Sequence, residues 1–494
     1  MWLYELFDRA GLECPENVEN LEILNIVTDS RRVRRGSLFI CIRGGRSDGH
    51  DYIDDAIKAG ASVIVVEQVR DACVGGAAAF IMLDNTRRVA ALLYNSWYGG
   101  PAEKLKIIGV TGTNGKTSVT TMLYEIFSGL GLRSGLIGTV RCLSAGCRPL
   151  SLKSGDTEAN MTTPDPEQLY KALDVMVRDG VEYVFMEVSS HALSLCKVDA
   201  ITFDCAVFTN LSRDHLDFHG TMDEYYRAKS TLLSRSRRAI INIDGEYGKR
   251  LADECPCPFF TLSERDGDFC ALDVRTFGVA GSEYRLRSPL GEGNINIPLA
   301  GDFFVTNSLM AASLALLYGL PLDGIARILS NTRGVKGRME KVELPTDEFS
   351  VIIDYAHTPD ALEKLLKSVF RIKAPYGHII LIFGCGGERD REKRREMAQI
   401  ASRFSDLVIV TSDNCRGEDP KQIFSDILKG IDKERPYCLI EDRAVAIESA
   451  VISAGYGDII VLAGKGHERY EINADGKRPF DETKIVKAAF RKRS

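Results

Sequence analysis

The stretch GVTGTNGKTS at residues 109–118 decides the fold of the middle of this chain. An apolar run at residues 105–110 leads into it, and the helix-like run VTTMLYEIF follows it. A glycine-rich turn between a strand and a helix points backbone amides and the positive helix end at phosphate oxygens. The stretch therefore predicts a nucleotide-binding loop, with a glycine turn and a solvated lysine as the simpler alternative.

The spacing within this loop departs from the commonest phosphate-binding pattern. That pattern, GxxxxGK[ST], needs glycine at position 110, where this chain has Val110, so the spacing here is GxxGxxGKT. Lys116 is expected to neutralise the terminal phosphates and Thr117 to bind Mg²⁺. The departure excludes the commonest form of the loop. The reaction in which the nucleotide takes part must be inferred from other motifs.

Size and composition restrict the class of protein. A chain of 494 residues exceeds one hydrophobic core, and about two to four domains are expected. The net charge of -6, with both signs intermixed, favours small-molecule partners over nucleic acid. The longest apolar run, residues 309–320, falls short of the roughly 20 residues that span a bilayer, and the acidic start lacks signal-peptide charge. We therefore expect a cytoplasmic protein without a membrane span.

Two breaks in the sequence pattern divide the chain. YGGPAEK at residues 98–104 predicts a boundary near residue 102, and NTRGVK at residues 331–336 predicts one near residue 335. The expected domains are residues 1–102, 103–335 and 336–494. Both later segments alternate apolar β-rich runs with helix-period stretches, which predicts parallel α/β sheets.

The 13 cysteines show no framework spacing, which indicates reduced thiols. Cys255 and Cys257 form a CxC pair with no second pair nearby, so we expect a loop there instead of a metal site.

Two further motifs carry acidic and histidine side chains. In FMEVSSHAL, Glu187 ends an apolar run, where it either holds a metal beside the phosphates or caps a helix. DHLDFH at residues 214–219 offers zinc as an alternative, but no cysteine lies within it. Mg²⁺ with His215 as a ligand fits better. Lys229, on the next helix-like stretch, is by itself a typical surface lysine.

The third segment places charged, glycine-containing loops after four apolar runs. Because parallel strands end at one sheet edge, these loops should line one crevice. The alternative is four solvated loops. The loops are DYAHTPDAL at residues 354–362, GCGGERDREKR at 384–394, DNCRGEDP at 413–420 and AGKGHE at 463–468.

Taken together, TGTNGKTS, EVSSHAL, NLSRDHLDFHG, DYAHTPD and GKGHE resemble the Mur ligases in order and spacing across nearly the whole chain. The match is to the muramoyl-tripeptide synthetase branch, and TDSR at residues 28–31 resembles its uridine-nucleotide domain. The resemblance implies three domains: an N-terminal uridine-nucleotide-binding α/β domain, a central P-loop ATPase domain with a mostly parallel sheet, and a C-terminal Rossmann-like domain.

The resemblance also implies an activity. With ATP and Mg²⁺, a monomer would phosphorylate the glutamyl γ-carboxylate of UDP-N-acetylmuramoyl-L-alanyl-D-glutamate. The amine of meso-2,6-diaminopimelate would then attack the acyl phosphate, in the cytoplasmic stage of peptidoglycan synthesis. The alternatives are the L-lysine-adding ligase of the same family and, with less support, a P-loop kinase. A nucleotide sensor would give Glu187, His215 and Lys229 no purpose, and folylpolyglutamate synthetase would not be expected to carry TDSR or DNCR.

The family pattern assigns roles to residues of this chain. The catalytic and metal-binding residues are Lys116, Thr117, Glu187, His215 and Lys229, the last as a carbamate. The ATP contacts are Gly112, Thr113, Asn114, Gly115, Lys116, Thr117, Ser118, Asn307, Arg338, Asp354 and His357. The UDP-substrate contacts are Ser30, Gly45, Arg46, Ser47, Thr162, Thr163, Ser189 and Lys197. The amino-acid contacts are Arg389, Asp413, Asn414, Cys415, Arg416, Gly464 and Glu468. The chain departs from the family at Met161, Leu195 and Lys197.

The expected preference for diaminopimelate depends on Arg416. The loop resembles the DNPR loop of the diaminopimelate-adding branch, with Cys415 in place of its proline. A guanidinium binds a carboxylate through two parallel hydrogen bonds, and lysine lacks the second carboxylate that diaminopimelate carries. In the alternative, Arg416 pairs with Glu418 or Asp419 on the surface.

Overall fold

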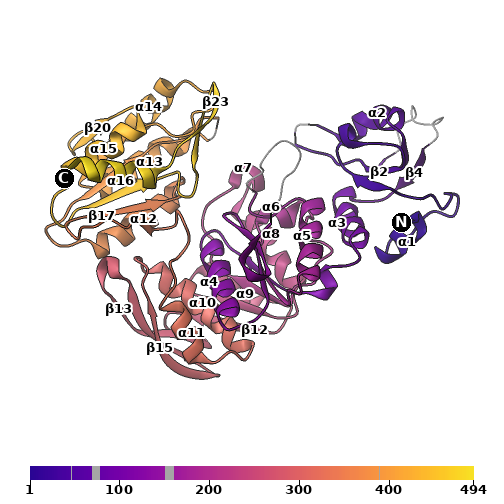
Figure 1. Cartoon of the computed structure of the whole chain (residues 1–494), viewed down its shortest axis with the longest axis horizontal. Coiled ribbons are helices and arrows are strands. Elements are labelled where there is room, and N and C mark those ends of the chain that lie inside the picture. The colour runs from indigo at the N-terminus through magenta and orange to yellow at the C-terminus, as the bar shows by residue number, and fades with distance from the viewer. Residues whose placement is uncertain (46, 69–77, 151–160, 389, 494) are drawn as a thin grey trace.

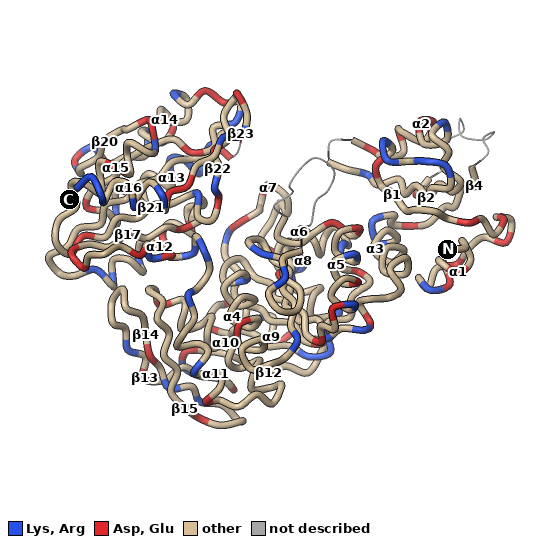
Figure 2. Tube along the Cα trace, viewed as in Figure 1, with Lys and Arg blue, Asp and Glu red and all other residues tan. Residues whose placement is uncertain are grey.

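The structure is a computed structural model that describes residues 1–45, 47–68, 78–150, 161–388 and 390–493. Figure 1 shows three lobes in chain order, from the indigo N-terminal lobe through the central lobe to the yellow C-terminal lobe. Lysine and arginine alternate with aspartate and glutamate along all three lobes (Figure 2). Within the described part of the chain, no helix is both long enough and apolar enough to cross a membrane.

The N-terminal lobe is built on a four-stranded parallel sheet. Its order is β1-β2-β3-β4, with β1 at Asn25–Val27, β2 at Ser37–Ile40, β3 at Ala61–Val66 and β4 at Ala79–Met82. The run ASVIVV of β3 is apolar except for Ser62, as expected for a strand that is covered on both faces. The helices are α1 (Leu3–Arg9), α2 (Ile53–Lys58) and α3 (Thr86–Trp97).

The central lobe holds an eleven-stranded sheet in the order β15-β14-β13-β12-β11-β10-β5-β9-β6-β7-β8. Its middle strands pair in parallel, while β13 to β15 and β6 to β8 pair antiparallel at the two ends. The parallel strands are β5 (Lys106–Thr111), β6 (Ser134–Ile137), β9 (Tyr183–Glu187), β10 (Cys205–Phe208), β11 (Ala239–Asn242) and β12 (Phe259–Ser263). The end strands are β7 (Cys142–Ser144), β8 (Arg148–Pro149), β13 (Phe269–Thr276), β14 (Ser282–Ser288) and β15 (Gly291–Ile297).

Helices of the central lobe connect these strands. They are α4 (Lys116–Gly129), α5 (Pro166–Arg178), α6 (Ser190–Ser194), α7 (Leu216–His219), α8 (Met222–Ser234), α9 (Glu246–Asp253), α10 (Phe303–Leu317) and α11 (Leu322–Leu329). The long apolar run noted in the sequence forms most of α10, which is buried over nearly its whole length and packs against α4. A helix that is apolar all round belongs inside the protein.

The C-terminal lobe carries a six-stranded sheet in the order β16-β17-β21-β18-β19-β20, parallel except for β16. Its strands are β16 (Glu340–Lys341), β17 (Ser350–Asp354), β18 (Ile379–Phe383), β19 (Leu407–Val410), β20 (Tyr437–Leu439) and β21 (Ile459–Ala463), beside a hairpin of β22 (Tyr470–Asn473) and β23 (Gly476–Pro479). The helices are α12 (Pro359–Ile372), α13 (Glu392–Phe404), α14 (Pro420–Leu428), α15 (Arg443–Ser453) and α16 (Glu482–Arg493).

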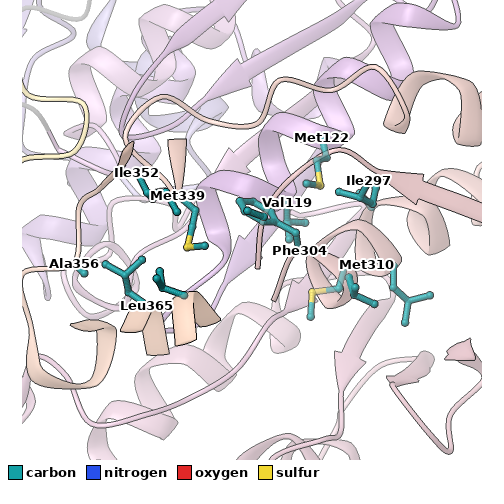
Figure 3. Packing of buried hydrophobic residues seen from close by; sticks show 14 of the residues in the cluster. Val119, Met122, Ile297, Phe304, Met310, Met339, Ile352, Ala356 and Leu365 are labelled. Atoms are coloured by element: carbon teal, nitrogen blue, oxygen red, sulfur yellow. The ribbon is translucent and has the colours of Figure 1, made fainter. Parts of the chain in front are cut away.

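One buried apolar cluster runs from the central lobe into the C-terminal lobe. Figure 3 shows members of it: Val119 and Met122 from α4, Phe304 and Met310 from α10, and Ile352 and Leu365 from the C-terminal lobe. Because the cluster is continuous, the helix behind the glycine-rich loop and the C-terminal sheet belong to one connected apolar core.

The α/β class, the three domains and the mostly parallel sheets are confirmed. The apolar runs expected to be strands, at residues 351–354, 378–383, 407–411 and 458–463, form β17, β18, β19 and β21, and the bounds agree to within one residue at each end. The domain limits at residues 102 and 335 stay predictions.

Phe127 of α4 tests this core. It is fully buried, and its ring centroid lies 4.8 Å from that of Phe185, 5.1 Å from Tyr183 and 5.7 Å from Tyr318. Phe127→Ala should destabilise the central domain by about 3–5 kcal/mol, because it removes a large buried ring and leaves a cavity. Urea unfolding measures the loss. The exposed Phe370→Ala should change stability by less than about 0.5 kcal/mol, and equal effects of both variants would contradict this packing.

Candidate active site

The glycine-rich loop joins the end of β5 to the start of α4, as predicted. Thr113 donates its backbone N–H to the carbonyl of Asn210 at 2.9 Å, so the loop is held against the end of β10. A Cβ atom on Gly115 would lie 2.6 Å from Oδ1 of Asn307, which is buried on α10. Only glycine at this position permits the close approach of the Asn307 side chain, which therefore lies at the nucleotide loop as expected. Ser118 lies buried in the first turn of α4.

Two lysines meet at one carbonyl oxygen in this loop. Lys116 donates from Nζ to the carbonyls of Gly112 and Thr113, both at 2.9 Å. Lys229 of α8 donates from Nζ to the same Gly112 oxygen at 2.7 Å, and Nζ lies 4.7 Å from the ring centroid of Tyr225. Lys229 is 1% exposed, so its interpretation as a surface lysine is wrong.

The surroundings of Lys229 favour its neutral amine. Burial lowers its pKa well below the ordinary range, and the charge of Lys116 lowers it further, against a weaker opposite effect of Asp214. Burial also lowers the pKa of Lys116. A neutral amine is a nucleophile, so Lys229 can react with small electrophiles at a pH where a surface lysine stays protonated.

Glu187 lies at the end of β9 and is held by two threonines. Its Oε2 accepts the hydroxyls of Thr117 at 2.9 Å and Thr139 at 3.0 Å, and its Oε1 accepts the Thr139 N–H at 2.8 Å. The helix-cap alternative for Glu187 is wrong, because the side chain of Ser189 caps α6. The sequence reasoning did not identify Thr139 as a functional residue, because it lies in the connection after β6 and outside every motif.

The residues expected to bind metal gather around the same loop. His215 precedes α7 and lies with Nε2 3.4 Å from Oδ2 of Asp214, and its ring centroid is 6.2 Å from that of Tyr225, the residue beneath Lys229. The described residues include no group of three His, Cys, Asp or Glu side chains that could hold a metal by themselves. Mg²⁺ usually keeps several waters and takes phosphate oxygens, so the hydroxyl and carboxylate of Thr117 and Glu187 fit a magnesium–nucleotide complex.

Three predicted nucleotide contacts lie at the edge of the C-terminal lobe. The guanidinium of Arg338 stacks 4.8 Å from the ring centroid of Tyr355, and its buried Nε has no hydrogen-bond partner among the described residues. Asp354 accepts the N–H groups of Met339 at 2.7 Å and Ala356 at 2.8 Å, and burial raises its pKa. Nδ1 of His357 lies 2.8 Å from the Tyr355 carbonyl oxygen.

Asp360, at the start of α12, connects the C-terminal lobe to the nucleotide loop. Its Oδ2 accepts the side-chain amide of Asn114 at 3.2 Å, the hydroxyl of Ser212 at 2.8 Å and the ammonium of Lys364 at 2.8 Å. Ser212 in turn donates its N–H to the hydroxyl of Thr113 at 3.0 Å. The final aspartate of DYAHTPD is therefore a functional candidate that the sequence reasoning missed, although the motif contained it.

The predicted UDP-substrate residues fall into two groups. Thr162, Thr163 and Ser189 lie beside Glu187: the Thr163 hydroxyl donates to the Glu187 carbonyl at 2.9 Å, and the hydroxyl oxygens of Thr139 and Thr162 lie 3.1 Å apart. Ser30, Gly45 and Ser47 belong to the N-terminal lobe, while Arg46 and Arg389 lie outside the described residues.

Lys197 is buried and already engaged. Its Nζ pairs with Oδ1 of Asp165 at 2.8 Å and lies 3.5 Å from Sδ of Met161. Two of the positions at which the chain departs from the family therefore contact one another.

The four charged loops of the third segment meet at one sheet edge, as predicted. Asn414 donates from Nδ2 to Oε2 of Glu468 at 2.8 Å, and Gly464 donates its N–H to the Asp354 carbonyl at 3.0 Å. A Cβ atom on Gly464 would lie 3.0 Å from Oδ2 of Asp413, so these loops approach closely. The carbonyl of Cys415 accepts the N–H of Glu418 at 3.0 Å.

Arg416 does not pair with Glu418 on the surface, which was the alternative to a role in substrate binding. Glu418 is bound by Arg394 at 2.7 Å and 2.9 Å, while Arg416 donates from Nη1 to the carbonyls of Gly387 at 2.7 Å and Asn414 at 3.3 Å. The guanidinium of Arg416 is thus held at the edge of the Asp413–Glu468 cluster.

Comparison with known proteins agrees with this geometry. Three family models match the chain: the Mur ligase family catalytic domain at residues 22–98, the Mur ligase middle domain at 110–315 and the Mur ligase glutamate ligase domain at 337–466. The chain is similar to two proteins named UDP-N-acetylmuramoyl-L-alanyl-D-glutamate--2,6-diaminopimelate ligase. The one from Clostridioides difficile is 42% identical over 94% of this chain and 95% of its own length, and the one from Gloeobacter violaceus is 41% identical over 100% and 99%. A solved structure with the same name has a TM-score of 0.69 and 30% identity, and covers 98% of both chains.

Thr139 provides a test of this site. Thr139→Val should weaken the binding of magnesium nucleotide by about tenfold, because a hydrogen bond to a charged group contributes about 1.5–3 kcal/mol. Titration calorimetry with nucleotide and Mg²⁺ measures the change. Thr139→Ser keeps the hydroxyl and should stay within about twofold of the wild type. Wild-type binding by the valine variant would show that Thr139 does not position Glu187.

Proposed function

The chain belongs to the Mur ligase family, and we propose that it is the ligase that adds meso-2,6-diaminopimelate to UDP-N-acetylmuramoyl-L-alanyl-D-glutamate in peptidoglycan synthesis. The reaction consumes ATP and releases ADP and phosphate. The observation that carries this proposal is the contact of Asp360 with Asn114 and Ser212, which brings the nucleotide loop next to the lobe with the charged pocket. A ligase needs this proximity, because the amine must reach a carboxylate that ATP has activated.

The chemistry follows from the weakness of a carboxylate as an electrophile. The γ-carboxylate oxygen of the glutamyl residue attacks the γ-phosphorus of ATP, the bond to the β-phosphate oxygen breaks, and ADP leaves. The neutral amine then attacks the acyl carbon, the C–O bond to phosphate breaks, and the amine loses its proton as the amide forms. Lys116 would leave its two carbonyl partners to neutralise the transferring phosphoryl group. Thr117, Glu187 and His215 would hold Mg²⁺, which would supply further positive charge to the phosphates when bound.

We assign Lys229 a second role as a carbamate. Its neutral amine would attack CO₂, forming an N–C bond while one C–O π bond opens and one proton is lost, which converts a neutral group into an anion. The anion would attract the charge of Lys116 and provide oxygen atoms of the kind that Mg²⁺ prefers. The support is the burial of Lys229, its depressed pKa and its shared contact with Gly112.

Three sets of side chains would bind the substrates. ATP would be held by the loop from Gly112 to Ser118 together with Asn307, Arg338, Asp354 and His357. The UDP substrate would contact Ser30, Gly45, Arg46, Ser47, Thr162, Thr163, Ser189 and Lys197. Diaminopimelate would contact Arg389, Asp413, Asn414, Cys415, Arg416, Gly464 and Glu468. We propose that the enzyme acts as a cytoplasmic monomer.

The direct test supplies the UDP-muramoyl dipeptide and ATP with one candidate amino acid at a time and records product masses. We expect the tripeptide mass with diaminopimelate, and phosphate release that requires the amine. The tripeptide mass with lysine alone would identify the lysine-adding ligase. A phosphorylated product that accumulates as the stable end product, whether or not an amine is present, would identify a kinase.

Arg416→Ala tests the choice of amino acid. The guanidinium would bind the second carboxylate of diaminopimelate, so kcat/KM for diaminopimelate should fall at least about tenfold, or 1.4 kcal/mol, with little further loss for lysine. Initial rates with each amino acid give the comparison. The exposed Arg435→Ala is the control and should change neither rate. An unchanged preference in the Arg416 variant would refute its role in selectivity.

Lys229→Ala tests the carbamate. Without the metal-binding group, turnover should fall at least about a hundredfold, and a small carboxylate such as formate should restore part of it. In the wild type, ¹³C-bicarbonate should give a carbamate NMR signal that the variant lacks, while the exposed Lys249→Ala keeps it. Full activity of Lys229→Ala without an added carboxylate would defeat the proposal.

A further inference from the structure

Lys465 is a fully buried lysine that none of the roles above includes. It follows β21 in the AGKGHE loop, and its Nζ donates to Oδ1 of Asn414 at 3.2 Å and to the Tyr470 carbonyl at 3.1 Å. It also pairs with Oδ1 of Asp413 at 3.4 Å. A buried ammonium with several oxygen partners is held in one position, because removing any partner would leave charge uncompensated.

This ammonium fixes the orientation of the Asn414 side chain. Oδ1 of Asn414 accepts from Lys465 and from the N–H of Ile472 at 2.9 Å, so two donors identify this atom as the oxygen. The amide nitrogen must then face the other way, where Nδ2 donates to Oε2 of Glu468 at 2.8 Å. Lys465 and the Ile472 N–H together therefore determine, through Asn414, where the carboxylate of Glu468 lies.

The positive charge of the same ammonium offsets part of the repulsion between two nearby carboxylates, Asp413 and Glu468. Burial alone would raise the pKa of Asp413, but the charges of Lys465 and Arg443 hold it below its usual value. Burial raises the pKa of Glu468, Asp413 adds to the increase, and Asn414, Lys465 and Arg416 oppose it. Among the described residues, the charged and titratable groups that interact with this pair include Lys465, Arg443, Arg416, Tyr355, Cys385 and Cys415.

We propose that Lys465 is a positioning residue for the amino-acid substrate: it orients Asn414 and so places the carboxylates of Asp413 and Glu468 to bind the substrate's ammonium groups. The inference rests on the proposed ligase function and deepens it. Arg416 would receive the carboxylate end, while the Asp413–Glu468 pair receives ammonium groups. Lys465 itself touches no substrate, because it is enclosed by its partners.

The test compares Lys465→Met, Lys465→Gln and Lys465→Arg with the exposed Lys487→Met as a matched control. KM for diaminopimelate, ATP and the UDP substrate are measured separately, and KM for diaminopimelate is followed from acidic to neutral pH. Lys465→Met should raise KM for diaminopimelate at least about tenfold and leave the other two within about twofold. In Lys465→Met, the rise in KM for diaminopimelate at acidic pH should begin at a higher pH than in the wild type. The reason is that both carboxylates gain protons at higher pH when the cation is absent. Lys465→Gln, which keeps a donor but no charge, should show the same pH shift, and Lys465→Arg should retain most of the wild-type behaviour.

The outcomes separate the two proposals. Wild-type enzyme that forms no product with diaminopimelate would overturn the proposed function and this inference together. Active wild type with an unchanged diaminopimelate KM and pH profile in Lys465→Gln would overturn the role of Lys465 alone. A purely structural role would lower the folded fraction, seen by circular dichroism, and would reduce kcat without a selective change in KM or pH profile, which also overturns the inference.

Discussion

The carbonyl oxygen of Gly112 accepts hydrogen bonds from two lysine side chains, and the rest of the site is arranged around that contact. Two ammonium groups that share one acceptor oxygen, at 2.9 Å and 2.7 Å, lie close enough to repel each other by roughly 3 kcal/mol at an effective dielectric constant near 20. Burial of Lys229 increases the penalty, since few waters can reach it. The site therefore favours a neutral or modified Lys229, and it favours an anion next to Lys116. A nucleotide phosphate is such an anion.

The fold supplies the rigid support that such a contact needs. The glycine-rich loop begins at the end of β5, Glu187 at the end of β9, and the DHLDFH motif follows β10, so neighbouring parallel strands deliver all three. The continuous apolar cluster of α4, α10 and the C-terminal sheet keeps the two lobes packed behind the loop. Polar contacts through Asp360 then connect the lobes at the site itself. The carboxylate can thus be activated in one lobe and the amine bound in the adjoining lobe, close to each other.

The sequence was most informative where chemistry and backbone pattern coincide. The loop at residues 109–118, the carboxylate at the end of β9 and the four charged loops of the third segment could all be predicted, because each follows an apolar strand. Lys229 was assigned only through the resemblance, since a lysine on a helix is usually exposed and burial is a tertiary property. Thr139 and Lys465 could not be predicted, because their roles depend on which distant carboxylates the fold brings to them. Asp360 lay within a motif, but its contact with Asn114 joins positions far apart in the chain.

The central claim is that ATP activates the glutamyl carboxylate as an acyl phosphate before the amine attacks. It is tested most directly with UDP-muramoyl dipeptide that carries ¹⁸O in both oxygens of its γ-carboxylate. After turnover with ATP and diaminopimelate, mass spectrometry of the products should find one ¹⁸O in each inorganic phosphate and one in each new amide carbonyl. Phosphate without ¹⁸O, or ¹⁸O in AMP in place of phosphate, would contradict the account.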